Sequence, residues 1–155
     1  MADEVTLRLE LEQQQDYQFS IRFDEPGLAP LLTDEPPPLG AGAGPNPSLL
    51  LLAAISNCLA ASLLFALRKF RNEPGRLRAS VTATRERNPE GRWRIPRAEV
   101  TLHLPEAAGH YLNLDRILAQ FEEFCVVTQS VREGIEVTTR VEDRNGLRLK
   151  VREAP

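Results

Sequence analysis

The chain has few of the residues that most often carry metal or redox chemistry. Its 155 residues include only two cysteines, two histidines, one methionine and one tryptophan. His103 falls on the polar side of an alternating segment, and His110 lies in a linker. Neither histidine has the spacing to a cysteine that a zinc site requires. We therefore expect no metal site, which leaves Cys58 and Cys125 as the main candidates for chemistry.

An excess of positive charge is also missing. The formal net charge at pH 7 is −3 and the pI is about 5.5, so the chain has no general attraction to phosphate backbones or anionic lipids. Trp93 stands among arginines at positions 92, 94 and 97 without a groove-reading motif. We expect no nucleic-acid partner and interpret this segment as a hairpin with a solvated face.

The start of the chain lacks the pattern of a secretory signal. Charges recur through residues 1–13, which contain no apolar stretch and no small-residue cleavage site. We therefore expect a cytoplasmic protein. Because cytoplasmic thiols are normally reduced, the two cysteines should be transiently oxidised, catalytic or simply buried, and not permanently cross-linked.

Alternation of apolar and polar residues predicts six half-buried strands arranged as three hairpins. The turns fall at residues 13–16, 88–91 and 143–146. The six strand segments are residues 5–12, 17–23, 77–83, 98–104, 135–141 and 147–151. Helical patterns lie between these hairpins, so the sequence predicts an α+β fold.

Residues 24–45 separate the first hairpin from the first helix. They hold six of the twelve prolines and four of the nine glycines, which favours an ordered surface loop, an arm or a mobile lid over regular structure. Asn46 and Pro47 then suit the N-cap and the first position of a helix. Basic residues near its end and the Pro74–Gly75 breaker predict a helix over residues 46–71.

The predicted helix contains an unusually long apolar run. Residues 49–67 carry no charge, which reaches the lower range for a transmembrane span, and the basic residues that follow resemble a cytoplasmic flank. Against this alternative stand Ser56 and Asn57 in the middle of the run, and six strands that need a helix apolar on all sides. We expect a core helix whose free face meets a second subunit in an intertwined homodimer, without a membrane.

A second helical pattern leads to Cys125. Its apolar residues are Leu112, Leu114, Ile117, Leu118, Phe121 and Phe124. A cysteine at a helix break can approach another element, and amides at a new helical start lower its pKa. Gln129 and Ser130 either shape the site around Cys125 or cap a short helical turn. Cys58, taken alone, is typical of a small residue that fills a crowded helix interface.

Two motifs carry a specific resemblance. Residues 44–54, Gly-Pro-Asn-Pro-Ser-Leu-Leu-Leu-Leu-Ala-Ala, followed by Cys58, resemble the central-helix motif of the OsmC/Ohr family, and residues 125–130, Cys-Val-Val-Thr-Gln-Ser, resemble its second motif. The order of the predicted elements matches as well. The resemblance implies a single OsmC-like domain over residues 1–155, forming an intertwined homodimer with two antiparallel-rich sheets wrapped around two long central helices.

The resemblance also implies an activity. Family members are thiol peroxidases that reduce organic hydroperoxides or hydrogen peroxide near the dimer interface. Cys58 would be the peroxidatic residue that becomes a sulfenic acid, and Cys125 would be the resolving residue that condenses with it to form a disulfide. A dihydrolipoamide-like dithiol would be the reductant. The resemblance implies no metal and no bound organic cofactor.

The chain departs from the family at two positions. Peroxidatic members carry a glutamate after the Asn-Pro helix start and an arginine in the N-terminal hairpin, whereas this chain has Ser48 at the first position and no arginine in the turn at 13–16. On one helix, Ser48 lies roughly 15 Å of axial rise from Cys58. A group that activates the Cys58 thiol must therefore come from elsewhere.

Three residues are candidate substitutes for the missing pair. Arg22 lies at the end of a predicted strand, and Asp34 and Glu35 lie in the proline-rich loop. They are the nearest candidates to supply the activating group, from their own or from the partner chain. In the alternative interpretation, Arg22 is a solvated strand residue and the two acids keep a loop soluble. The corresponding alternative function is a non-catalytic OsmC-like dimer that binds an apolar small molecule at the subunit interface.

Overall fold

The computed structural model describes residues 4–152 and is an α+β protein. The chain forms two compact units. One contains the residues up to 54 together with residues 81–99, and the other contains residues 55–80 together with the residues from 100 on. A long helix and a long hairpin contribute to both units, and each unit is described by itself below.

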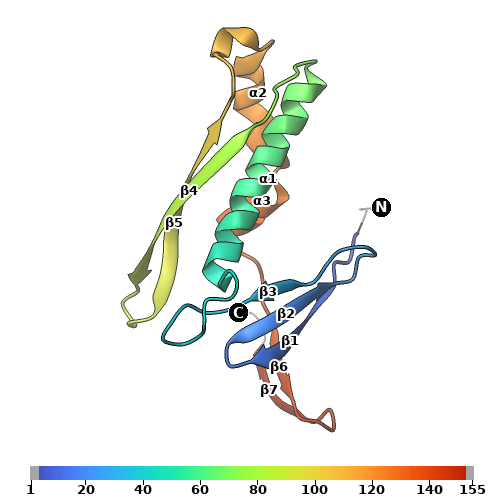
Figure 1. Ribbon diagram of the computed structural model, residues 1–155, viewed down its shortest axis with the longest axis vertical. Helices are drawn as coiled ribbons and strands as arrows, with labels where there is room; N and C mark the ends of the chain where they lie inside the picture. The colour runs from blue at the N-terminus through green and yellow to red at the C-terminus, as the bar shows by residue number, and fades with distance from the viewer. Residues whose placement is uncertain (1–3, 153–155) are drawn as a thin grey trace. The chain divides into compact units, whose positions relative to one another are not determined.

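Helices and strands follow the predicted order. The elements are β1 (Leu9–Gln15), β2 (Gln18–Phe23), β3 (Leu31–Thr33), α1 (Pro47–Lys69), β4 (Arg78–Arg87), β5 (Trp93–His103), α2 (Leu114–Gln120), α3 (Val126–Glu133), β6 (Thr139–Glu142) and β7 (Arg148–Arg152) (Figure 1). Short 3-10 turns η1 (Ala108–His110) and η2 (Phe121–Phe124) flank α2. Within the described residues the strands form three small sheets, ordered β1-β2-β3, β4-β5 and β6-β7. The predicted α+β class is confirmed.

The first hairpin is confirmed, with a shorter turn than predicted. β1 and β2 pair antiparallel, with Leu9 opposite Phe23 and Gln15 opposite Gln18. Gln13 to Gln15 therefore belong to the strand, and the chain reverses at Asp16, whose φ of 44° lies in the left-handed region. Asp tolerates that region better than most residues, so the reversal needs no glycine.

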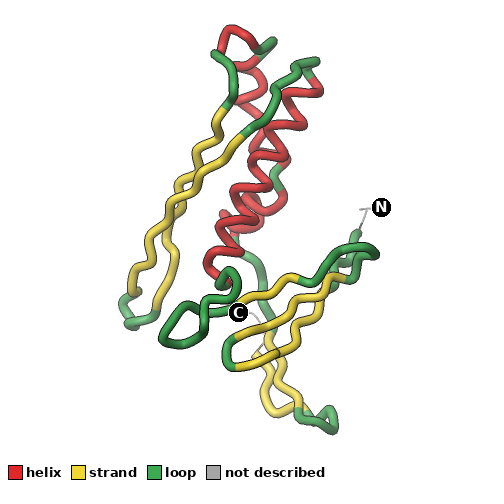
Figure 2. Tube along the Cα trace, in the orientation of Figure 1, coloured by secondary structure: helices red, strands yellow, loops and turns green. Residues whose placement is uncertain are grey.

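Residues 24–45 are more regular than predicted. Leu31–Thr33 forms β3, which pairs antiparallel with β2 and places Leu31 opposite Ile21 (Figure 2). The expectation of irregular structure throughout this segment is wrong at these three residues. They lie between prolines but include none, so their amides are free to bond the open edge of β2.

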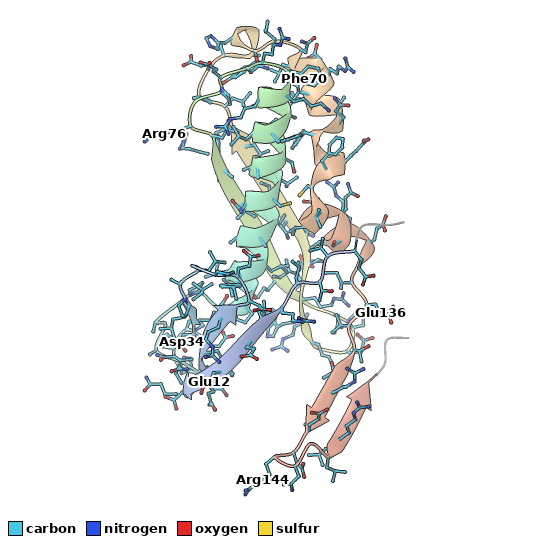
Figure 3. All side chains as sticks on the ribbon, turned by 90° about the vertical axis from the view of Figure 1, so that its right-hand side faces the viewer. Glu12, Asp34, Phe70, Arg76, Glu136 and Arg144 are labelled. Atoms are coloured by element: carbon cyan, nitrogen blue, oxygen red, sulfur yellow. The ribbon has the colours of Figure 1, made fainter. Side chains whose placement is uncertain are left out.

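Asp34 holds together the loop that follows β3. Its side chain is buried and accepts hydrogen bonds from the amides of Glu35, Ala41 and Ala43 at 2.8, 3.1 and 3.0 Å, and from the Gln18 side chain at 3.4 Å (Figure 3). The Ala43 amide is the strongest of the influences that lower the pKa of Asp34, and they outweigh burial, which raises it. The Asp34 carboxylate thus accepts hydrogen bonds from loop amides that have no acceptor in a sheet or helix.

The start of α1 agrees with the prediction. Asn46 Oδ1 accepts a hydrogen bond from the Leu49 amide at 3.0 Å, as an N-cap residue does. Among the described residues, α1 is the one helix that is long and apolar enough to cross a membrane, and 22% of its most apolar stretch is buried by the chain. The buried residues follow helical spacing and are Ile55, Leu59, Leu63, Ala66 and Leu67.

The end of α1 is closed by Asn72. The Asn72 amide bonds the Leu67 carbonyl at 3.0 Å and the Arg71 amide bonds the Arg68 carbonyl at 2.9 Å, with Arg71 at a φ of 61°. This is a Schellman motif, in which the last helical carbonyls receive donors from beyond the helix. The Asn72 side chain also donates to the carbonyls of Leu67 and Leu112, and accepts from the Leu112 amide at 2.7 Å.

The core of the second unit forms between α1 and the helices that follow β5. Figures 1 and 3 show α2 and α3 running beside the C-terminal part of α1. Leu63, Leu67 and Ile117 are almost completely buried there. The single second helix predicted up to Cys125 is instead α2 followed by η2, and the turn predicted after Cys125 is the eight-residue helix α3.

The strands are more exposed than predicted. Large apolar side chains of the hairpins remain open to solvent in one chain, among them Leu9, Leu11, Trp93 and Val141. The alternation therefore located all six predicted strands but not their ends, since β5 begins at Trp93 and not at 98, and β6 begins at Thr139 and not at 135. It also overstated how far this chain alone covers them. Apolar faces of this kind are normally covered by another surface.

We expect the loop held by Asp34 to loosen in acid. Because the folded pKa of Asp34 is depressed, its contribution is present above the ordinary carboxyl pKa of about 3.9 and is lost as the pH falls through the folded pKa. The protection factors of the Ala41 and Ala43 amides, which compare their hydrogen exchange with that of an unstructured chain at the same pH, should fall in the Asp34→Ala variant at neutral pH. In the parent they should fall only in acid. An Asp24→Asn variant is the control, and equal protection in Asp34→Ala and the parent would contradict this account.

We expect Asn72→Ala to destabilise the second unit by about 2–4 kcal/mol, because the variant leaves the backbone groups of Leu112 without their partner. Denaturant unfolding measures the change. The matched control is Glu123→Ala at an exposed, charged position of η2, which should change the free energy of unfolding by less than about 0.5 kcal/mol. A cost for Asn72→Ala no larger than that of the control would refute the bridging role.

Candidate functional site

The second unit brings the two cysteines together. Cys58 lies on α1 and is half-buried, whereas Cys125 is completely buried at the break between η2 and α3. Both are free thiols, and Cys58 packs against the buried cluster that contains Cys125. Each thiol is among the groups that shift the pKa of the other.

The break at Cys125 explains why it meets α1. Its backbone is extended, with φ −85° and ψ 95°, between a 3-10 turn and the first turn of α3. A helix start leaves its first amides without acceptors inside the helix. Here the amides of Val126 and Val127 lower the pKa of the Cys58 thiol, and the amide of Thr128 lowers the pKa of Cys125. The start of α3 therefore favours the ionised form of both sulfurs.

Two hydroxyl groups complete the surroundings of Cys125. Its Sγ lies 2.9 Å from Oγ1 of buried Thr128, a hydrogen bond in which the hydroxyl is the donor when the sulfur is ionised. Ser62 is half-buried on α1, one turn after Cys58, and its hydroxyl is among the groups that lower the pKa of Cys125. Cys58, Thr128 and Ser62 thus all act on the Cys125 thiol from within the same unit.

These partners lower the pKa of Cys125. Burial raises the pKa of this thiol, but the hydrogen bonds from Cys58, from the Thr128 hydroxyl and amide, and from Ser62 lower it by more. The result lies below the ordinary pKa of a cysteine. Hydrogen bonds that favour the ionised form are the cause, since no cationic side chain is among the main contributors.

Cys58 shows the opposite shift. Burial raises its pKa, and the hydrogen bond shared with Cys125 raises it further, while the amides of Val127 and Val126 compensate only in part. The two thiols therefore ionise as a pair, with the first negative charge favoured on Cys125 and the remaining proton on Cys58. Chemically, the arrangement is a dithiol that gives up two electrons when it closes to a disulfide.

Thr128 and Ser62 were not identified from the sequence. Thr128 follows Cys125 by three residues, the spacing at which the first turn of a helix faces its N-cap. Ser62 follows Cys58 by four residues and so shares its face of α1. Both spacings were visible in the sequence, but that the two hydroxyls meet on one sulfur depends on how α1 packs against α3.

The two polar residues predicted near Cys125 bond to the backbone. The Gln129 side chain donates to the Glu122 carbonyl at 3.2 Å, and the Ser130 hydroxyl donates to the Val126 carbonyl at 2.8 Å. These bonds fix η2 and the first turn of α3, which agrees with the capping alternative.

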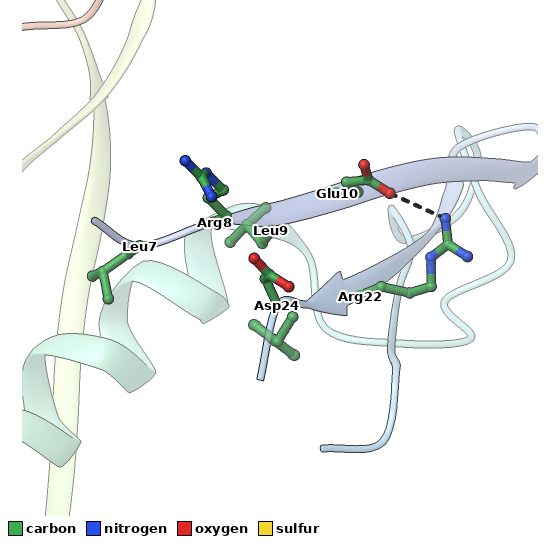
Figure 4. Close-up of a pocket in the computed structure, with 7 residues that line it drawn as sticks. Leu7, Arg8, Leu9, Glu10, Arg22 and Asp24 are labelled. Atoms are coloured by element: carbon green, nitrogen blue, oxygen red, sulfur yellow. Dashed lines mark hydrogen bonds and ion pairs between the residues drawn. The ribbon is translucent and has the colours of Figure 1, made fainter. Parts of the chain in front are cut away.

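Arg22 belongs to the first unit and is paired with Glu10. The ion pair spans β1 and β2 at 3.2 Å, and both side chains are exposed. It borders a hollow of about 630 Å³ together with Leu7, Arg8, Leu9, Glu10, Phe23 and Asp24 (Figure 4). Exposed pairs of this kind contribute about 0–1 kcal/mol to stability, and the position of Arg22 fits a solvated strand residue.

Glu35 and Ser48 also lie in the first unit. Glu35 is half-buried, and its backbone bonds Asp34 and Gly42. Ser48 lies in the first turn of α1 and borders a hollow of about 340 Å³ with Leu51, Arg85, Trp93, Arg94 and Ile95. Neither this hollow nor the one at Arg22 contains a thiol, so cavity size does not locate the cysteine pair.

Three solved structures illustrate the likeness of fold. A putative osmotic stress induced and detoxification response protein from Psychrobacter arcticus has 18% identity and a TM-score of 0.66, over 84% of this chain and 91% of that chain. OsmC from Legionella pneumophila, an organic hydroperoxide resistance protein, has 15% identity and a TM-score of 0.63, with 84% and 92% covered. A putative organic hydroperoxide resistance protein from Vibrio cholerae, with captopril bound in one of its active sites, has 19% identity and a TM-score of 0.64, with 96% and 97% covered.

The sequence comparisons identify the family to which the chain belongs. Among curated proteins none matches this chain. The family model described as OsmC-like protein matches residues 40–140, which is well over half of the chain and includes both cysteines. The chain therefore belongs to the OsmC-like protein family.

Proposed function

We propose that the protein is a thiol-dependent peroxidase that reduces organic hydroperoxides or hydrogen peroxide with Cys58 and Cys125. The observation that supports this most is the packing of two free thiols in one buried cluster, where each shifts the pKa of the other and Thr128 Oγ1 lies 2.9 Å from Cys125 Sγ. Structural relatives named for organic hydroperoxide resistance support the same substrate class.

In the first step Cys58 acts as the nucleophile, because it is the more exposed of the two sulfurs. A proton crosses the hydrogen bond from Cys58 to Cys125, and the Cys58 thiolate attacks the terminal oxygen of the peroxide. The O–O bond breaks, Cys58 becomes a sulfenic acid, and the departing alkoxide takes the proton from Cys125 to leave as an alcohol. Cys125 is again a thiolate.

In the second step Cys125 resolves the intermediate. Its thiolate attacks the Cys58 sulfur, hydroxide leaves and takes a proton from solvent, and a Cys58–Cys125 disulfide forms. A dithiol reductant of the dihydrolipoamide type then returns both thiols by exchange and becomes a disulfide itself. In the net reaction, one hydroperoxide is reduced to an alcohol and water, and one dithiol reductant is oxidised to its disulfide.

The exposed apolar surfaces support an intertwined homodimer. Large side chains on α1, including Leu49 and Phe65, and those on the hairpins are open to solvent in a single chain. A second copy would cover them and would place the apolar α1 inside a protein core, so we propose a cytoplasmic dimer of single-domain chains. Arg22, Glu35, Ser48 and Gln129 are secondary candidates for shaping the site in that dimer.

A second function is a dimer that binds an apolar small molecule without catalysis. Ser48 favours it, because this position carries a glutamate in the peroxidatic pattern. The two functions differ in one respect that can be measured, since only the peroxidase consumes hydroperoxide through its cysteines.

We expect Cys58→Ser to abolish peroxide consumption supported by a dithiol reductant, because it removes the nucleophile. Cys125→Ser should still react once, and a sulfenic acid at Cys58 should then be trapped by a dimedone-type reagent. Steady-state peroxide assays and peptide mass spectrometry provide the measurements.

The control is Ser130→Ala, whose hydroxyl bonds the backbone of α3, and it should retain activity within about twofold of the parent. Peroxide consumption that is equal in the parent and in Cys58→Ser would eliminate the peroxidase and leave the binding dimer.

A further inference from the structure

We propose that Thr128 and Ser62 direct thiol–disulfide exchange at this site by holding Cys125 as the thiolate that leaves when a reductant attacks Cys58. The inference rests on the proposed Cys58–Cys125 disulfide and assigns positioning roles to two hydroxyls that neither motif of the family resemblance singled out. It also specifies where the reductant binds covalently, at Cys58.

Access and chemistry favour the same sulfur for attack. Cys125 is completely buried, whereas Cys58 keeps part of its surface open. An incoming thiolate must approach a disulfide in line with the S–S bond, so the buried sulfur of Cys125 is the poorer target. Cys125 is the better leaving group because its neighbours lower its pKa by more than burial raises it. The hydroxyls of Thr128 and Ser62 act on the buried sulfur.

The exchange is balanced in two steps. A reductant thiolate attacks Cys58, the S–S bond breaks, and Cys125 departs with the electron pair as a thiolate that accepts hydrogen bonds from the two hydroxyls. The second thiol of the reductant, as a thiolate, then attacks the reductant's sulfur in the mixed disulfide. The reductant closes to an intramolecular disulfide, and Cys58 is released and protonated. The reductant is oxidised by two electrons and the protein dithiol is restored.

The packing explains why both hydroxyls are needed. Thr128 is fixed by the first turn of α3 and Ser62 by α1, so they approach Cys125 from the two elements that carry the disulfide. When Cys125 leaves as a thiolate, the Thr128 hydroxyl 2.9 Å away has only to rotate to donate to it, and no solvent has to reorganise around the new charge. A lower leaving-group pKa speeds exchange.

The test uses the full chain oxidised with diamide, so that disulfide formation does not depend on peroxidase activity. Thr128→Val and Ser62→Ala are compared with Ser130→Ala as the control, and Thr128→Ser is the conservative variant. Three readouts are followed: the rate of reduction by excess dithiothreitol, the equilibrium with a glutathione redox buffer, and the pH profile of thiolate absorbance in the reduced protein.

We expect Thr128→Val to slow reduction by about 3–10-fold and Ser62→Ala to slow it by a smaller factor. The double variant should shift the equilibrium about tenfold toward the disulfide, which corresponds to about 30 mV. The first ionisation of the dithiol should move to higher pH in both variants, while Thr128→Ser and Ser130→Ala stay near the parent. These changes would not follow from a loss of packing alone.

Brief treatment of the oxidised parent with glutathione, followed by acid quenching, should place the mixed disulfide on Cys58. A mixed disulfide on Cys125, unchanged reduction rates in both hydroxyl variants, or failure of diamide to form the disulfide would each overturn the proposal. If the parent does not react with hydroperoxide but the diamide-formed disulfide responds as described, the peroxidase proposal fails and the exchange roles of Thr128 and Ser62 stand.

Discussion

The site depends on one packing contact, in which Cys58 of α1 packs against the buried cluster that contains Cys125. Cys125 reaches this cluster at the point where the chain leaves η2 and starts α3. The break turns free amides and the Thr128 hydroxyl toward the sulfurs. One change of backbone direction thus determines that the two thiols pack together, which of them ionises first and which of them remains accessible to solvent.

The ionisation order assigns different tasks to the two sulfurs. The buried Cys125 has the stronger set of donors and a lowered pKa, whereas the accessible Cys58 has a raised pKa. At first sight the nucleophile is then the wrong cysteine. In the proposed mechanism the shared proton resolves this, because its transfer from Cys58 to Cys125 would leave the charge on Cys58 when a peroxide binds. Activation by a neighbouring thiol, two hydroxyls and helix-start amides would serve a chain that has Ser48 where the peroxidatic pattern has glutamate.

Local signals in the sequence predicted the parts of the fold that local physics determines. The Asn46 cap, the hairpin turns and the helix break at Cys125 followed from short-range preferences, and the two motifs indicated both cysteines. The strand at Leu31–Thr33 was missed because the composition of the whole proline-rich segment concealed three residues that can pair with β2. Thr128 and Ser62 were missed because their common target arises from packing between α1 and α3. The exposure of the hairpins was misjudged because alternation identifies an apolar face but does not say whether the same chain or another one buries it.

The most direct test of this account is a single turnover of the reduced protein with one equivalent of an organic hydroperoxide, followed by acid quenching and peptide mapping at successive times. The account predicts that the Cys58–Cys125 cross-linked peptide appears at the rate at which the peroxide disappears, with two thiols lost per peroxide consumed. Peroxide that persists while both thiols remain free would contradict it, and so would oxidation of Cys125 before Cys58.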